Sequence, residues 1–397
     1  MKSTGTGSYR GPCQQADIRF RVLFGLAAFF SFVSGSVLFR WLNDEFEVRD
    51  FRHVMRAGST LATRSDPIIK PTNVVFFMDG FEAEVNRMNQ GGAGGEIRLF
   101  RSFINAARSC SDVQMQVMTA VDDSSEASLR AADLIVSDQY RLASLISVIP
   151  DATNPAIACK LRFIDFWGTP PEQNHIHLRL EQFLVSYPNP WNEFLGFRQD
   201  LITSTNDDDS DRPIILLHGK LGRYFRNHLS VIAALTESYK VVATVPSAQL
   251  DGLQFPTSVV NVGICNSTEW QRILVRSSAV IGFGDPVLAP TAFEAIAAGS
   301  PYIFAKYAQP RSLTDLPAHP IRSQHDFMMK IGPPYAYAIN VDEANAVLET
   351  VRSAIQNKIE AWIPEAYTAM QHSERVRNIL HKDFCREEPS NLPQQII

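Results

Sequence analysis

The stretch SAVIGFGDPVLAPTAFEAIAAGSPYIFAKY, residues 278–307, combines the signals for a strand, a loop, a helix and a second strand. Its apolar, β-branched start at 278–281 predicts a buried parallel strand. Glycines and prolines favour a loop before the helical pattern, which ends at Gly299, a typical C-terminal cap. The apolar residues 302–305 predict another strand. Together these signals indicate one βαβ unit of a parallel sheet.

The loop and the first helical turn of this unit carry candidate ligand-binding residues. Gly282 and Gly284 loosen the loop backbone, and the helix begins at Pro290 or Thr291. An anion beside that helix start would meet unpaired amides and the positive end of the helix dipole. Glu294, in the first turn, could accept hydrogen bonds from the hydroxyls of a sugar, or it could only complement the dipole.

Length and composition describe a folded chain of two domains. Its 397 residues exceed one ordinary domain, and 45% hydrophobic with 20% charged residues suit a sizeable core. A formal net charge of -5 gives no electrostatic reason to expect a nucleic-acid partner.

An apolar run, VLFGLAAFFSFVSGSVLF, occupies residues 22–39. As a helix it would span roughly 27 Å, close to the thickness of the hydrocarbon core of a membrane. Basic residues before the run and acidic residues after it predict a cytoplasmic tail at 1–21 and a luminal body, as in a type II membrane protein. A cleaved signal peptide is the alternative, but this run is longer than the usual apolar core of such a peptide.

The rest of the chain predicts a stem and two domains. Residues 40–72 have no firm period and are interpreted as a short stem. Strand and helix patterns then alternate over 73–198 and again over 213–397, which predicts two doubly wound, Rossmann-like α/β domains facing a cleft. The acidic run NDDDSD indicates a linker at 199–212. Within the second domain we expect a proline-rich loop after Lys306.

Glu96 follows the glycine-rich sequence GGAGG at the expected start of a helix. Glycines there allow the backbone to approach a ligand, and the carboxylate could take a proton from a hydroxyl group. A helix start also weakens a carboxylate as a base, so partial burial would have to offset the dipole. The alternative is a carboxylate that only complements the dipole after a long loop at 79–95.

Two lysines are candidates for neutralising a phosphate group. Lys306 follows the second strand of the βαβ unit, and Gly219 and Lys220 lie in the loop expected after a strand at 213–217. Either lysine could instead be a solvated surface charge. The acidic run at 207–211 has Asp-x-Asp spacing but does not follow an apolar strand, so we interpret it as linker and predict no metal site.

The sequence leaves disulfide pairing open. Cys13 falls in the expected cytoplasmic tail, and no cysteine has the spacing of a metal site. The remaining cysteines would be luminal and allow three pairings. These are Cys110, Cys159, Cys265 and Cys385.

Asn266 begins the sequon Asn-Ser-Thr, which the expected topology would expose to glycosylation. Thr268 and Gln271 have the spacing of a helix capping box, so the same stretch also predicts a helix start. Both interpretations can hold together.

From about residue 73 to residue 385 the chain resembles the α-1,6-mannosylglycoprotein 6-β-N-acetylglucosaminyltransferases, the family of N-acetylglucosaminyltransferase V. The resemblance lies in dispersed blocks that occur in the family's order. The blocks are GGAGGE at 91–96, LRFIDFWGTPPEQNH at 161–175, FLGF at 194–197, HGK at 218–220, VIGFGDPVLAPTAFEAIAAG at 280–299, SQH at 323–325 and NKIEAWIPEAYT at 357–368.

The resemblance implies a GT-B fold and a metal-independent, inverting transfer of GlcNAc from UDP-GlcNAc in the Golgi. The acceptor it implies is the 6-hydroxyl of an α-linked mannose on an N-glycan. The family's catalytic base falls on Glu96, and its donor-ribose carboxylate falls on Glu294. Amides near Ala289 to Ala292, together with Lys306, would then support the departing diphosphate.

Two departures from the family concern the acceptor. The stem is shorter than that of the vertebrate family, which carries an additional luminal domain, and the stretch after residue 175 is compressed. Another UDP-sugar enzyme of the same fold therefore remains an alternative. So does a catalytically silent glycan-binding protein of the secretory pathway.

Overall fold

The computed structural model describes residues 72–89, 94–174, 178–203, 213–313 and 316–386. The expected tail, the apolar run near the N-terminus, the stem before its last residue and the acidic run lie outside these residues. Within the described part of the chain, no helix is long and apolar enough to cross a membrane.

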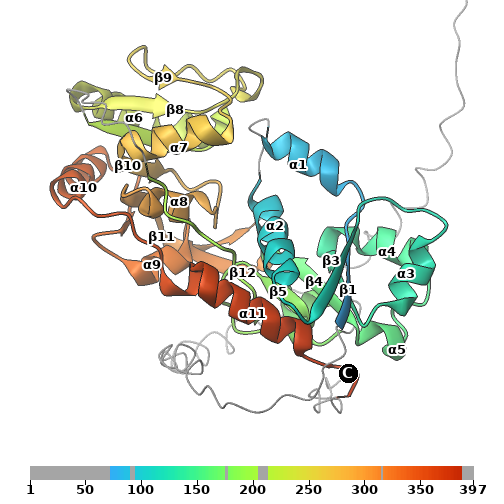
Figure 1. Cartoon of the computed structure of the whole chain (residues 1–397). Coiled ribbons are helices and arrows are strands. Elements are labelled where there is room, and N and C mark those ends of the chain that lie inside the picture. Colours follow the sequence, from blue (N-terminus) through green and yellow to red (C-terminus); the bar gives the residue numbers. More distant parts are fainter. Residues whose placement is uncertain (1–71, 90–93, 175–177, 204–212, 314–315, 387–397) are drawn as a thin grey trace, which may run out of the picture. The chain divides into compact units, whose positions relative to one another are not determined.

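The first half of the described chain forms a six-stranded parallel sheet in the order β2-β1-β3-β4-β5-β6. Figure 1 labels β1, β3, β4 and β5 of this sheet. Its strands are β1 (Thr72–Phe77), β2 (Val113–Met118), β3 (Leu134–Asp138), β4 (Leu161–Asp165), β5 (Phe183–Val185) and β6 (Glu193–Phe194). Its helices are α1 (Phe81–Asn89), α2 (Gly95–Arg108), α3 (Ser125–Ala131), α4 (Leu142–Val148) and α5 (Pro155–Ala158). The parallel sheet predicted from the alternation of strands and helices is confirmed.

The second half forms a seven-stranded sheet in the order β12-β11-β10-β7-β8-β9, with β13 also paired to β11. Its strands are β7 (Ile214–His218), β8 (Lys240–Ala243), β9 (Val260–Asn261), β10 (Ser277–Gly282), β11 (Tyr302–Leu313), β12 (Leu316–Ser323) and β13 (Ala336–Ile339). Its helices are α6 (Leu229–Ser238), α7 (Ser267–Arg276), α8 (Thr291–Ala297), α9 (Asp326–Ile331), α10 (Ala344–Gln356) and α11 (Ala369–His381). All pairs are parallel except β11 with β12.

The βαβ unit predicted from residues 278–307 is confirmed. β10 and β11 run parallel, with Val280 opposite Tyr302, and α8 lies between them in the chain. The apolar residues of β10 are fully buried, as expected for a strand covered on both faces.

The prediction of a proline-rich loop after Lys306 is wrong. β11 continues through Leu313 and pairs antiparallel with β12. The register shifts between Lys306 and Arg311, and Pro310 falls in this interval. Proline is tolerated at such irregularities and on edge strands, and β12 is an edge strand, so prolines did not prevent strand pairing here.

The long loop expected at 79–95 is also wrong, because α1 forms within it. Phe81 at the start of α1 is buried against the core of the first sheet. Glu84 and Arg87 form an i,i+3 ion pair in which Arg87 Nε donates to Glu84 at 2.9 Å. Val85 and Met88 also pack against this core, so an apolar face and an ion pair support a short helix here.

The end of the described chain returns to the first sheet. α11 packs against α2 and β1 (Figure 1). Cys159, at the end of α5, forms a disulfide with Cys385, which follows α11. Cys110 and Cys265 are free thiols. The disulfide therefore fixes the C-terminal end of the second half to the first half.

An aromatic cluster connects α8 to residues of the first half. The Phe293 ring of α8 lies 4.2 Å from Tyr367, 5.3 Å from Phe197 and 5.9 Å from Tyr187 between centroids. All four side chains are buried. Aromatic side chains bury large areas and pack with specific geometry, so this cluster holds α8 in a defined position.

Candidate active site

Glu96 is the second residue of α2 and is partly exposed. Asp138 ends β3, close enough to Glu96 for the two charges to interact. Burial raises the pKa of Asp138 to about 6; the Tyr140 amide and Arg141 oppose the shift, while the charges of Glu96 and Asp165 add to it. Glu96 therefore lies near a second carboxylate, Asp138.

Sequence reasoning missed Asp138 and Asp165. Asp165 ends β4, is buried, and accepts hydrogen bonds from Thr169 Oγ1 at 2.7 Å and the Trp167 amide at 3.1 Å. The signal was present, because LIVSD and LRFID are short, mostly apolar strand patterns that each end in an aspartate. The carboxyl ends of neighbouring parallel strands meet at one edge of a sheet, where ligands bind in α/β folds.

Glu294 lies in the first turn of α8 and is held by two side chains. Arg98 Nη1 donates to Glu294 Oε1 at 2.5 Å, and Trp270 Nε1 donates to Glu294 Oε2 at 2.9 Å. Arg98 belongs to α2, two residues after Glu96. The helix that bears Glu96 is therefore joined directly to the helix that bears Glu294, and nothing in the sequence indicated this role for Arg98.

The starts of α2 and α8 also adjoin. A Cβ atom placed on Gly95 would lie 3.4 Å from Pro290 Cδ and 3.4 Å from the Phe166 ring. Pro290 is the N-cap of α8, and Thr291 is its first residue. The structure thus brings the surroundings of Glu96 and Glu294 together, although the two residues are far apart in the sequence.

The unpaired amides expected at the start of α8 are only partly present. The Ala292 amide donates to the Ala289 carbonyl at 3.3 Å. The amides of Phe293 and Glu294 both donate to the Pro290 carbonyl, at 2.9 and 3.1 Å. The expectation is therefore wrong for Ala292, because a tight turn before the helix already supplies acceptors.

Gln324 forms hydrogen bonds with the loop at residues 283–290 that follows β10, here called the glycine loop. The Gly284 amide donates to Gln324 Oε1 at 3.1 Å, and Gln324 Nε2 donates to the Pro286 carbonyl at 3.0 Å. Gly284 has a φ of 107°, which favours glycine. A side chain on Gly282 would collide with Gln324 and lie 2.7 Å from the Tyr302 hydroxyl. Both glycines are therefore required by the shape of this loop.

The two lysines indicated by the sequence lie in the loop after β7 and on β11, which neighbours the loop after β10. Gly219 and Lys220 follow β7, the parallel neighbour of β10. Burial of its ammonium group lowers the pKa of Lys220, although part of the side chain is exposed, and the charge of Glu294 opposes this shift. Lys306 is exposed on β11, and Tyr307 beside it donates to a carbonyl of the glycine loop at 3.0 Å.

Asn266 is exposed and caps α7. Its Oδ1 accepts from the Glu269 amide at 3.0 Å, and Glu269 Oε2 accepts from the Asn266 amide at 3.0 Å. The capping box expected from Thr268 to Gln271 is therefore wrong, because the helix already begins at Ser267 and asparagine is a strong N-cap. The sequon itself lies on the surface.

No group of three or more His, Cys, Asp or Glu side chains among the described residues could hold a metal ion. The acidic run of the expected linker lies outside those residues.

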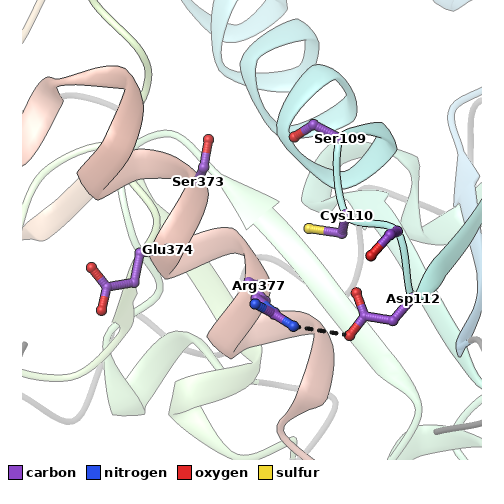
Figure 2. Close-up of a pocket in the computed structure, with 7 residues that line it drawn as sticks. Ser109, Cys110, Asp112, Ser373, Glu374 and Arg377 are labelled. Atoms are coloured by element: carbon purple, nitrogen blue, oxygen red, sulfur yellow. Dashed lines mark hydrogen bonds and ion pairs between the residues drawn. The ribbon is translucent and has the colours of Figure 1, made fainter. Parts of the chain in front are cut away.

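A cavity of about 320 Å³ is lined by residues that directly follow α2 and by residues of α11 (Figure 2). It therefore lies at the end of α2 opposite Glu96. Its wall includes Asp112, which pairs with Arg377 at 3.4 Å and with His381 Nε2 at 3.0 Å. The 14 residues of α2 span roughly 20 Å, so this cavity is separate from the candidate active site.

Comparison with protein families matches residues 104–396 to the model of glycosyltransferase family 18, Glyco_transf_18. The chain belongs to glycosyltransferase family 18. The matched region contains Glu294 and the lysines described above, whereas Glu96 lies just before it.

Curated relatives of this family 18 chain are named as branching transferases. Alpha-1,6-mannosylglycoprotein 6-beta-N-acetylglucosaminyltransferase A of Cricetulus griseus is 27% identical over 257 residues, which are 57% of this chain and 34% of the relative. The B enzyme of Mus musculus is 25% identical over 266 residues, 59% of this chain and 34% of the relative. The chain spans about a third of the length of the curated relatives it matches.

Similarity to solved structures is weaker. The UDP-GlcNAc 2-epimerase of Neisseria meningitidis bound to UDP-GlcNAc aligns with a TM-score of 0.44 and 9% identity, over 78% of this chain and 99% of the epimerase. Nothing about the function of the family 18 chain follows from similarity at this level.

Proposed function

We propose that this family 18 chain is an inverting β-1,6-N-acetylglucosaminyltransferase with the GT-B arrangement of two α/β halves. It would transfer GlcNAc from UDP-GlcNAc to the 6-hydroxyl of an α-linked mannose on an N-glycan. The observation that carries the proposal is the meeting of α2 and α8, the helices that bear Glu96 and Glu294. The names of the curated relatives supply the transferred N-acetylglucosaminyl group and the α-1,6-mannosylglycoprotein acceptor, and the family resemblance implies UDP as the carrier.

In the proposed reaction Glu96 is the general base. It accepts the proton of the acceptor hydroxyl while the hydroxyl oxygen forms a bond to the anomeric carbon of GlcNAc. The bond from that carbon to the UDP oxygen breaks on the opposite face of the sugar, so the anomeric configuration inverts. Proton uptake by Glu96 also removes one of the negative charges that act on Asp138.

In the proposed donor site Glu294 holds the ribose. A carboxylate offers about four lone-pair positions, and Arg98 and Trp270 use one on each oxygen. The remaining positions can accept hydrogen bonds from vicinal ribose hydroxyls. Pro290 and Thr291, at the start of α8, lie within one turn of Glu294 and would border the same donor site.

The leaving diphosphate is proposed to depart without a metal cofactor. Lys220 and Lys306 supply positive charge beside the diphosphate as its negative charge develops. A divalent cation fills this role in other transferases. Gly219, Gly282 and Gly284 allow the loops after β7 and β10 to approach the phosphates.

The proposed location is the Golgi membrane, with single-pass type II topology and a luminal catalytic body. Residues 22–39 supply the apolar length for one anchor, and the charge distribution around them sets the orientation. Protease protection of intact vesicles tests this topology. Digestion of the body from the cytoplasmic side would contradict it.

The function is tested with the full chain in detergent, a panel of UDP-sugars, N-glycan acceptors and EDTA. We expect transfer from UDP-GlcNAc with EDTA present, and a β1,6 linkage to mannose when the product is analysed by NMR. Preference for another UDP-sugar, or glycan binding without turnover, would overturn the proposal in favour of one of the alternatives above.

A further inference from the structure

Arg98 is held on three sides at the junction of α2 and α8. Its Nη1 donates to Glu294 Oε1 at 2.5 Å, and its Nη2 donates to Gln199 Oε1. The guanidinium carbon lies 5.1 Å from the centroid of the Phe197 ring. A planar guanidinium with two directed hydrogen bonds and a stacked aromatic ring has one defined orientation.

Gln199 is itself anchored, so Arg98 does not depend on a mobile partner. The backbone amide of Gln199 donates to the Tyr367 carbonyl at 2.9 Å, and the side-chain Nε2 of Gln199 donates to the Asp200 carbonyl at 2.6 Å. Tyr367 belongs to the buried aromatic cluster around Phe293 of α8. The orientation of Arg98 is therefore fixed by the same core that positions α8.

Glu294 receives one donor on each oxygen, and the two donors come from different elements. Arg98 of α2 binds Oε1, and Trp270 of α7 binds Oε2 at 2.9 Å. The side chains of Arg98 and Glu294 are only 23% and 22% exposed, so solvent screens their attraction less than it would at the surface. The plane of the carboxylate is set by these two bonds.

We propose that Arg98 is a positioning residue for the donor nucleotide. It orients the Glu294 carboxylate so that the free lone pairs meet the ribose hydroxyls, and it ties donor binding to the helix that carries Glu96. This inference rests on the proposed function, in which Glu294 holds the ribose. Without Arg98, the carboxylate keeps only the Trp270 bond and can rotate away from the nucleotide.

The test compares UDP binding and transfer kinetics of the full chain carrying Arg98→Met, Arg98→Lys or the control Arg101→Met. Arg101 is exposed on the same helix, so its substitution removes an equal charge away from Glu294. For Arg98→Met we expect the calorimetric Kd for UDP to rise roughly tenfold to a hundredfold, as expected on losing a charge-assisted hydrogen bond. The KM for UDP-GlcNAc should rise with it, while kcat falls less. Arg98→Lys should recover part of the affinity, and Arg101→Met should match the wild type.

A double-mutant cycle separates positioning from a general structural effect. If Arg98 acts through Glu294, Arg98→Met should add little to the UDP affinity already lost in Glu294→Gln. Trp270→Phe removes the other donor but keeps a ring, and it should raise the Kd for UDP less than Arg98→Met does. If Arg98→Met does not fold, Arg98→Lys and Trp270→Phe still measure the same dependence.

The outcomes distinguish this inference from the proposed function. A wild-type chain that transfers GlcNAc, with Arg98→Met binding UDP as tightly as Arg101→Met, would overturn the inference and leave the function standing. Additive losses in the cycle would also overturn it. A wild-type chain that neither binds UDP nor transfers GlcNAc would overturn both.

Discussion

We expect His372 to make the free energy of unfolding of the chain depend on pH. It is buried on α11, with Nε2 3.0 Å from Ser102 Oγ and Nδ1 3.3 Å from the Leu195 carbonyl oxygen. A carbonyl can only accept, so Nδ1 carries the proton, and Nε2 accepts from the Ser102 hydroxyl. Burial, assisted by the positive charge of Arg375, lowers the pKa of His372 to about 4.

The sign of the effect follows from proton binding. In the unfolded chain the pKa of a histidine is about 6.5. Between about pH 6.5 and pH 4 the unfolded chain binds more protons at His372 than the folded chain, so the free energy of unfolding falls as the pH falls. Above about pH 6.5 the neutral His372 costs the folded chain no stability. Relative to that pH, the free energy of unfolding is lower by about 2 kcal/mol at pH 5 and by about 3 kcal/mol well below pH 4.

The assay is urea unfolding of the oxidised full chain at pH 7 and pH 5, for the wild type and for His372→Gln. Glutamine can still donate one hydrogen bond and accept another, but it does not titrate. Between the two pH values the wild type should lose about 2 kcal/mol more than the variant. His218 and His325 are also buried, but they are present in both chains, so their contributions cancel in this comparison. Equal losses in the two chains would refute the reasoning.

Four further substitutions test three local features of the structure. Gly282→Ala forces a side chain against Gln324 and should lower the free energy of unfolding by about 1–3 kcal/mol in urea; no change would contradict the close approach. Thr268→Ala should abolish the glycosidase-sensitive mobility shift of a secretory-expressed chain without affecting the Asn266 cap, whereas Asn266→Ala should also cost about 1 kcal/mol. Cys385→Ser removes a disulfide between residues 226 positions apart and should cost about 2–5 kcal/mol; a wild-type chain with both cysteines free by thiol labelling would contradict the bond.

Local patterns in the sequence predicted most of the architecture. The βαβ unit at 278–307 could be predicted because the strand, the cap and the helix period all lie within one short stretch. β5 and β6 are too short to show a period, and they fall in the compressed stretch after residue 175. The β11–β12 hairpin was obscured by prolines, which usually indicate a loop but are tolerated at an irregular edge.

Only those residues of the candidate site that have a recognisable local sequence around them could be predicted. Glu96 and Glu294 were indicated by their glycine-rich and helical surroundings and by the family resemblance. Arg98 could not be predicted, because its partner is 196 residues away and only tertiary packing brings them together. The partnered amide of Ala292 was missed for a related reason, since hydrogen bonding in a turn depends on its exact backbone path.

We propose that Glu96, at the start of α2, removes the acceptor proton during GlcNAc transfer. The most direct measurement is transfer by Glu96→Gln beside calorimetric UDP binding by the same preparation. Glutamine keeps the size of the side chain and its place in α2 but cannot take the proton. We predict that turnover falls by at least roughly a hundredfold to ten-thousandfold while the Kd for UDP is unchanged. Substantial turnover by this variant, with UDP binding intact, would contradict the assignment.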